Sequence, residues 1–94
     1  LTVEEVFAQA AALNGKEVLL RAKVVKYNGG IMGKNWLHVQ DGSGAAGTND
    51  LTVTTSAPAE LGQVLLIKGT LATGKDFGAG YKYAVLIEDA TLTQ

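Results

Sequence analysis

The spacing of hydrophobic residues changes after Gly15. Before it, apolar side chains recur every three or four residues, which is the period of an amphipathic helix. Thr2 and Glu5 have the spacing of a capping box, in which each side chain bonds a free backbone N–H of the first turn. Asn14 and Gly15 both tolerate positive φ and stop a helix well. We therefore predict a helix over residues 1–14 whose apolar face covers another part of the protein.

Beyond Gly15 the period becomes two, as in half-buried strands. The pattern predicts five strands, at residues 18–27, 36–41, 51–55, 64–72 and 81–91. In the second strand Leu37 and Val39 point to the core. The other side of that strand carries Trp36, His38 and Gln40.

Between the strands, residues 28–35 and 73–80 are rich in glycine and are predicted to be loops. Five short strands and one helix, without a βαβ pattern, predict an all-β protein: a five-stranded antiparallel barrel plugged by the N-terminal helix. Closure removes the edges that an open sheet would expose. We expect one domain, with the helix at 1–14 and the barrel at 16–92.

Two groups of motifs carry a resemblance to a known fold. Residues 36–44 read WLHVQDGSG, and residues 61–64 read LGQV before Lys68-Gly69. These resemble the OB-fold superfamily, close to its anticodon-binding-like domains. The segments NGGIMGKNW (28–36) and KDFGAGY (75–81) are similar to small bacterial OB-fold proteins that are often exported. The resemblance implies an OB-type barrel and a periplasmic or cell-envelope location, and it supplies no catalytic residues. The usual OB helix between strands three and four has little room in residues 56–62, so the N-terminal helix is assigned its plugging role.

Charge is unevenly distributed along the chain. The net charge is −1, which argues against a strong overall attraction to nucleic acid or to an anionic membrane. Residues 18–40 nevertheless contain no Asp or Glu but carry Arg21, Lys23, Lys26 and Lys34. No apolar run could span a bilayer, and no signal peptide is visible. Because the chain starts at Leu1, we expect a processed or trimmed product.

The sequence predicts no enzyme, metal or cofactor. Without cysteine, disulfides and thiolate chemistry are excluded. His38 is the single histidine, and no spacing places a serine beside it. Asp41, Asp50 and Asp76 lie near glycine turns, where Asp bonds its own backbone. An enzyme would become credible only if a pocket beside His38 brought in Asp41 or Asp50.

One motif matches the sequence pattern of a cofactor-binding site. Residues 42–47 match G-x-G-x-x-G, the fingerprint of dinucleotide binding, but that motif requires a helix immediately after it. A loop and the third strand follow here, so we interpret the motif as a hairpin connection.

The candidate ligand-binding residues lie around the second strand. In an OB barrel the loops between strands one and two and between four and five flank a face centred on strands two and three. That face predicts a binding module for single-stranded nucleic acid or an oligonucleotide-like ligand. Stacking is assigned to Trp36 and Phe77, phosphate contact to Lys26, Lys34 and Lys75, and supporting contacts to His38 and Tyr81.

Two alternatives stay open at this point. Ile31, Met32 and Phe77 could fold back over Trp36 as a small second core. Arg21, Lys23 and Lys26 could track phosphates or be an ordinary solvated strand face. The apolar residues could instead form the interface of a protein- or peptide-binding accessory domain of the bacterial cell envelope, with a patch made of Ile31, Met32, Trp36, Phe77 and Tyr81.

Overall fold

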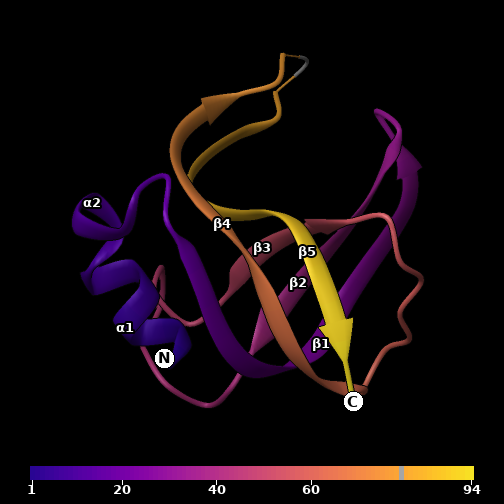
Figure 1. The fold of residues 1–94 in the computed structure, drawn as a ribbon, viewed down its shortest axis with the longest axis horizontal. Helices are drawn as coiled ribbons and strands as arrows, with labels where there is room; N and C mark the ends of the chain where they lie inside the picture. The colour runs from indigo at the N-terminus through magenta and orange to yellow at the C-terminus, as the bar shows by residue number, and fades with distance from the viewer. Residues whose placement is uncertain (79) are drawn as a thin grey trace.

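The computed structural model describes residues 1–78 and 80–94, so Ala79 of the predicted second loop lies outside the described residues. The chain is mostly β, as predicted (Figure 1). Its elements are α1 (Val3–Ala8), α2 (Ala10–Leu13), β1 (Glu17–Ile31), β2 (Lys34–Gln40), β3 (Leu51–Thr55), β4 (Val64–Asp76) and β5 (Lys82–Thr93).

The five strands form one closed sheet with the order β1-β2-β3-β5-β4, in which β4 pairs back onto β1. The prediction of a purely antiparallel barrel is wrong at one place, because β3 and β5 run parallel. The chain path explains this pairing. β1 and β3 run in one direction, β4 runs antiparallel to β1, and β5 runs antiparallel to β4. β5 therefore has the same direction as its neighbour β3. The sheet is therefore mixed, with four antiparallel pairs and one parallel pair.

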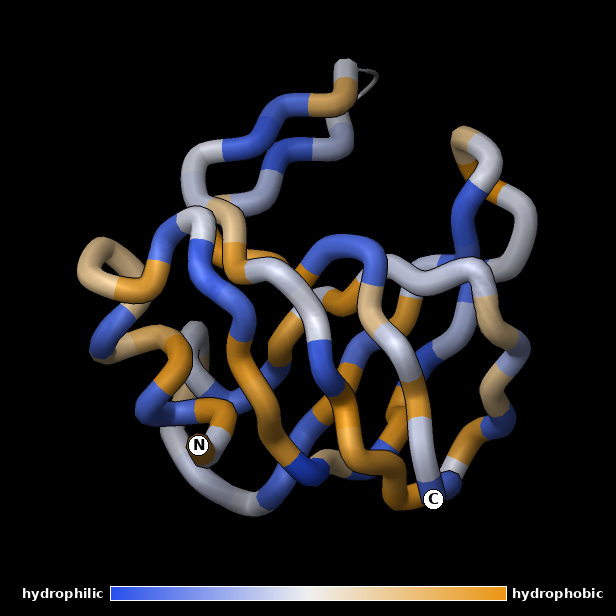
Figure 2. The backbone as a smooth tube through the Cα atoms, viewed as in Figure 1, coloured by the Kyte–Doolittle hydropathy of each residue, from blue (hydrophilic) through white to orange (hydrophobic). Residues whose placement is uncertain are grey.

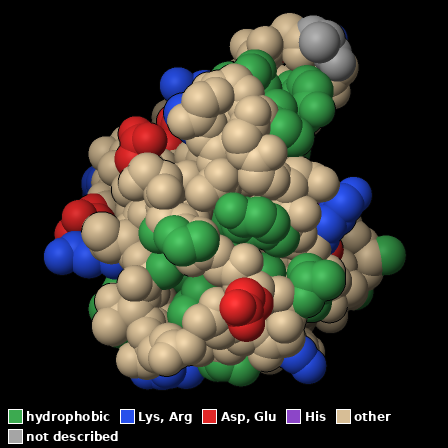
Figure 3. Space-filling model, turned by 90° about the vertical axis from the view of Figure 1, so that its right-hand side faces the viewer, with side chains coloured by type: hydrophobic (Ala, Val, Ile, Leu, Met, Phe, Trp, Pro, Cys, Tyr) green, Lys and Arg blue, Asp and Glu red, His purple; other side chains and the backbone are tan. Residues whose placement is uncertain are grey.

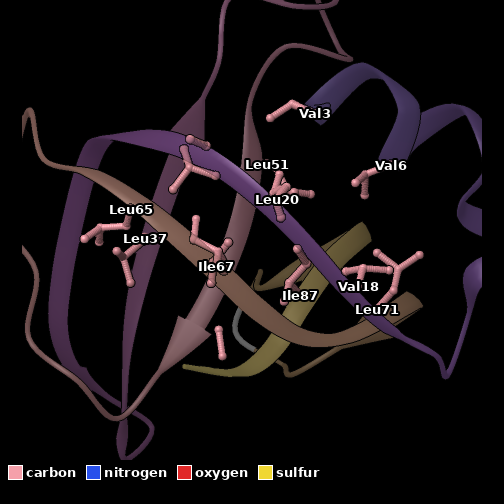
Figure 4. Close-up of a cluster of buried hydrophobic side chains, with 14 of the residues drawn as sticks. Val3, Val6, Val18, Leu20, Leu37, Leu51, Leu65, Ile67, Leu71 and Ile87 are labelled. Atoms are coloured by element: carbon pink, nitrogen blue, oxygen red, sulfur yellow. The ribbon is translucent and has the colours of Figure 1, made fainter. Parts of the chain in front are cut away.

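Alternation along the strands builds the core, as the sequence predicts. Buried and exposed residues alternate from Glu17 to Val24 in β1, and Leu37 and Val39 of β2 are fully buried. Figure 2 shows the same alternation as hydrophobic and hydrophilic segments along the strands. The inward residues of all five strands join in one cluster between the strands (Figure 4).

The N-terminal helix is confirmed, with one break. Thr2 and Glu5 form the predicted capping box, and Val3, Val6 and Ala10 are buried in the barrel cluster. Figure 4 shows Val3 and Val6 at one end of that core. The helix is interrupted at Gln9, whose φ of −104° and ψ of 12° separate α1 from α2.

Both predicted glycine loops are instead long β-hairpins. β1 and β2 continue to Ile31 and Lys34, which pair, so the turn between them consists only of Met32 and Gly33. These two residues have φ of 53° and 73°. Two consecutive positive values are typical of a primed two-residue turn, whose backbone twist matches the twist of the flanking strands. Likewise β4 and β5 stay paired up to Asp76 and Lys82. Both hairpins lie on the upper side of the barrel in Figure 1.

A close backbone approach at Gly69 allows β4 to cross β5. The β4–β5 register shifts between Lys68 and Thr70. A Cβ on Gly69 would lie 2.6 Å from Cγ2 of Ile87, which is shorter than real Cβ contacts. Only glycine fits at this position without a shift of the core.

No helix in the described part of the chain is long and apolar enough to cross a membrane.

Candidate functional site

Four aromatic side chains from both hairpins meet on the outer surface of the sheet. We call Trp36, Phe77, Tyr81 and Tyr83 the aromatic cluster. The Trp36 ring is edge-on to Phe77 at 5.2 Å and stacks on Tyr83 at 5.4 Å between centroids. Its Nε1–H donates to the Ile31 carbonyl at 2.9 Å. Alternation explains the position: Leu37 points inward, so Trp36 must point outward, where the β4–β5 hairpin curls over it.

The predicted role of Trp36 as an exposed stacking platform is not what the structure shows. Trp36 is only 3% exposed and forms a second hydrophobic cluster with Ala72 and Leu86, covered in part by Ile31 and Phe77. This is the small second core that the sequence left open as an alternative, except that Met32 is 47% exposed and does not join it, whereas Tyr83 does. The half-buried rings of Phe77, Tyr81 and Tyr83 are the aromatic surface that remains accessible. Burial, followed by the charge of neighbouring Tyr81, raises the pKa of Tyr83, so its phenol keeps its proton.

Two of the predicted phosphate-binding lysines have acidic partners. The Nζ of Lys34 lies 4.0 Å from Asp89 and 5.9 Å from the Phe77 ring centroid. The Nζ of Lys75 lies 3.5 Å from Glu88. Sequence analysis missed both pairs because each joins residues that are distant in the chain, and no local spacing places a β5 carboxylate beside Lys34 or Lys75. The two lysines are therefore partly neutralised as anion ligands.

The third strand contributes little to an accessible face. All five residues of β3 are buried. The Thr55 hydroxyl donates to the Ala90 carbonyl at 2.7 Å, and the Thr54 hydroxyl accepts the N–H of Asp89 at 3.2 Å. The expected face on strands two and three therefore moves to β1 and β2.

The outward sides of β1 and β2 bring three cations beside two polar side chains. The register pairs Lys23 with Gln40 and Lys26 with His38. Arg21 lies two positions further along the same side of β1. Arg21, Lys23 and Lys26 are exposed, and none of them belongs to an ion pair among residues 1–78 and 80–94. We call Arg21, Lys23, Lys26, His38 and Gln40 the β1–β2 face.

A groove of about 520 Å³ crosses one end of this face. Its lining combines the cations Arg21 and Lys23 with Gln40 and the carboxylate of Asp41. The apolar side chains Val25 and Val64 form other parts of the wall. Towards the other end, the register continues to Asn28 and Trp36, so the β1–β2 face leads directly to the aromatic cluster.

His38 has a carboxylate partner that sequence reasoning missed. Nδ1 of His38 lies 2.7 Å from Oδ1 of Asp50, and Nε2 of Gln40 donates to the other oxygen of Asp50 at 3.0 Å. The prediction that Asp50 would bond its own backbone is therefore wrong, because the preceding loop turns its side chain back onto β2. No hydrogen bond in the described chain joins His38 to a nucleophilic side chain. The pair is thus an oriented imidazole without the remaining parts of a hydrolytic triad.

The Asp-Gly-Ser-Gly turn holds the N-terminal helix in place. Asp41 accepts hydrogen bonds from the N–H of Val3 at 2.9 Å and of Ser43 at 3.0 Å, and Ser43 Oγ accepts from the N–H of Glu4. Burial alone would raise the pKa of Asp41, but these hydrogen bonds outweigh it and lower the pKa. The G-x-G-x-x-G match that starts here is followed by a turn and β3, with no helix after it. Asp76 bonds the N–H of Gly78, as expected of a turn residue.

No group of three or more His, Asp or Glu side chains among residues 1–78 and 80–94 could hold a metal ion. Comparisons with known proteins add no assignment: no protein-family model, curated protein or solved structure matches this chain.

Proposed function

We propose that this protein is a non-enzymatic binding module of the OB type, and that its ligand is single-stranded nucleic acid or an oligonucleotide-like polyanion. The observation that carries the proposal is the β1–β2 face. There, three cations that belong to no ion pair within the described part of the chain lie beside outward polar groups and lead to half-exposed aromatic rings.

The OB assignment is supported by the chain path and by the hairpins. Five strands close in the order β1-β2-β3-β5-β4, and β3 skips its sequence neighbour to pair with β5. The connections between β1 and β2 and between β4 and β5 are the ones that flank the ligand in OB domains. Here these two hairpins supply the aromatic cluster. The cell-envelope location implied by the resemblance stays a prediction.

The face has the two components that single-strand binding requires. Cations track the backbone, and aromatic rings stack on bases at about 1–3 kcal/mol for each stacked base. Arg21, Lys23 and Lys26 supply the first component along β1. Phe77 and Tyr81 supply the second, with Trp36 as their buried support.

Salt dependence tests the proposal quantitatively. Three phosphate contacts predict a slope of about −2 in log K against log salt for a single strand. Affinity should then fall about 16-fold between roughly 50 and 200 mM salt. Fluorescence anisotropy with a labelled mixed oligonucleotide of about 12 nucleotides measures this, since OB domains cover roughly 4–16 nucleotides.

Matched charge variants identify the surface. The double variant Arg21→Gln, Lys23→Gln should weaken binding and reduce the slope to about −0.7, because one of the three contacts remains. Lys68→Gln is the control: it removes a cation from β4 that already lies 3.7 Å from Glu17. Because the double variant removes two charges and the control removes one, an equal effect for each lost charge would show that binding follows net charge and not the β1–β2 face.

A protein or peptide ligand is the second candidate, and one observation favours it. Of the six exposed large hydrophobic residues, Leu19, Val25 and Val64 lie on β1 and β4, and Leu61 precedes β4. Figure 3 shows hydrophobic side chains in several separate groups on one side of the molecule. An apolar partner predicts binding that barely changes with salt, the opposite of the nucleic-acid proposal.

A further inference from the structure

The hydrogen bonds of Asp50 fix what the neighbouring side chains can offer a ligand. An ionised carboxylate only accepts hydrogen bonds. Asp50 therefore requires a proton on Nδ1 of His38 and takes one N–H of the Gln40 amide. His38 and Asp50 are partly exposed, at 28% and 36% of their side-chain surface, so the pair lies at the surface and not in the core.

Two acceptor atoms are left over on one side of β2. A neutral imidazole with its proton on Nδ1 presents an unprotonated Nε2, and the amide of Gln40 presents Oε1. No hydrogen bond among residues 1–78 and 80–94 uses either atom. Because His38 and Gln40 are two residues apart in a strand, both atoms lie on the outer surface of the sheet.

From this we infer that His38, Gln40 and Asp50 form a base-reading site that selects nucleobases with an exocyclic amino group. The inference rests on the proposed function and adds a specificity to it. Cytosine, adenine and guanine each carry an amino group with two N–H donors, which match two acceptors. Thymine and uracil present a carbonyl oxygen at the same place, which an acceptor pair repels. The cations Arg21, Lys23 and Lys26 hold the backbone, and this site discriminates between bases.

Cytosine and thymine give the sharpest comparison, because both are pyrimidines and differ most in the group that this site reads. We expect oligodeoxycytidine of about 12 nucleotides to bind about tenfold more tightly than oligodeoxythymidine of the same length at pH 8.

Asp50→Asn changes the hydrogen-bond pattern around His38 while it keeps the shape of the side chain at position 50. The asparagine NH₂ can donate to Nδ1 of His38, which moves the imidazole proton to Nε2 and turns an acceptor into a donor. The preference for oligodeoxycytidine should then disappear or reverse. Glu60→Gln is the control, because it removes the same negative charge from an exposed loop residue and should keep the preference.

The tautomer can be measured without any ligand. His38 is the single histidine, so a two-bond ¹H–¹⁵N spectrum of the imidazole reports it alone. We expect the Nδ1–H form in the unaltered protein and the Nε2–H form in Asp50→Asn. An Nε2–H form in the unaltered protein would overturn the inference.

The binding outcomes separate the two proposals. A preference for oligodeoxycytidine that Asp50→Asn abolishes supports the base-reading site. Equal binding of both oligonucleotides overturns this site but leaves nucleic-acid binding standing. If neither oligonucleotide binds at low salt, both the proposed function and the base-reading site are refuted.

Discussion

Replacing Trp36 with alanine separates a structural role of this ring from a ligand-binding one. Trp36 is 3% exposed, and its ring contacts Phe77 and Tyr83 at centroid distances of 5.2 and 5.4 Å. A buried Trp→Ala change costs about 3–5 kcal/mol through lost transfer free energy and the cavity that remains. Part of that cost comes from the aromatic contacts, at about 0.5–1.5 kcal/mol for each pair.

The expected loss is therefore about 3–5 kcal/mol out of a total stability of roughly 5–15 kcal/mol. In a domain of this size each kcal/mol lowers Tm by about 4–8 °C, so the variant should melt at least about 12 °C earlier. Urea unfolding followed by far-ultraviolet circular dichroism measures the free energy without relying on tryptophan fluorescence.

Two further variants make the comparison specific. Trp36→Phe keeps an apolar ring but loses the hydrogen bond to the Ile31 carbonyl, so it should cost clearly less than Trp36→Ala. Tyr81→Ala removes a half-buried ring and should cost less than about 2 kcal/mol. If Trp36→Ala unfolds within about 1 kcal/mol of the unaltered protein, the ring is not the centre of a packed cluster and our reasoning is refuted.

Three other changes test the packing and the caps. Gly69→Ala should destabilise by about 1–3 kcal/mol, because its Cβ would lie 2.6 Å from Ile87; unchanged urea unfolding would show that the strands can separate at no cost. Asp41→Ala should cost about 1–2 kcal/mol at pH 7 by removing the hydrogen bond to the N–H of Val3. Because the pKa of Asp41 is lowered on folding, its contribution is present above the unfolded value near 3.8 and is lost as pH falls through the folded value. The gap between the two proteins should thus close below about pH 4, and a constant gap would contradict the assignment. Thr2→Ala should cost about 1 kcal/mol and lower the helical signal, whereas an unchanged melting curve would exclude a capping role.

Most of the fold could be predicted because local pattern decides it. The strand Leu51–Thr55 follows from its β-branched residues. The inward positions Leu37 and Val39 follow from period-two alternation, which a single buried face enforces. The capping box of Thr2 and Glu5 likewise depends on residues three apart. The parallel pairing of β3 with β5 could not be predicted in this way, because it depends on where the chain closes and not on any local run.

Glycines explain why the two hairpins were interpreted as loops. Gly30 and Gly74 lie inside strands with φ of 71° and 61°, values typical of turns and bulges, so their residue type indicated a break. The signal that could have corrected this is the pair Met32 and Gly33, a two-residue turn between Ile31 and Lys34.

The candidate site was predicted only in part, because its chemistry depends on contacts between strands. The outward side of β2 was recognised, but the burial of Trp36 depends on a hairpin that arrives from residues 72–86. Asp50 is 12 residues from His38 and reaches it across a loop, which no spacing rule describes. Lys75 and Glu88 lie on neighbouring strands but are not register partners, since Lys75 pairs with Tyr83 and Glu88 with Thr70, so no pairing rule predicts their contact.

An amide NMR titration with a short mixed oligonucleotide, at roughly 50 and 200 mM salt, tests the central claim most directly. We predict shifts at low salt along the β1–β2 face, at residues 21–26 and 38–40, and around Phe77 and Tyr81, and we predict that they fade at the higher salt. A spectrum that does not move at either salt would contradict nucleic-acid binding, and shifts confined to other surfaces would contradict the assignment of the face.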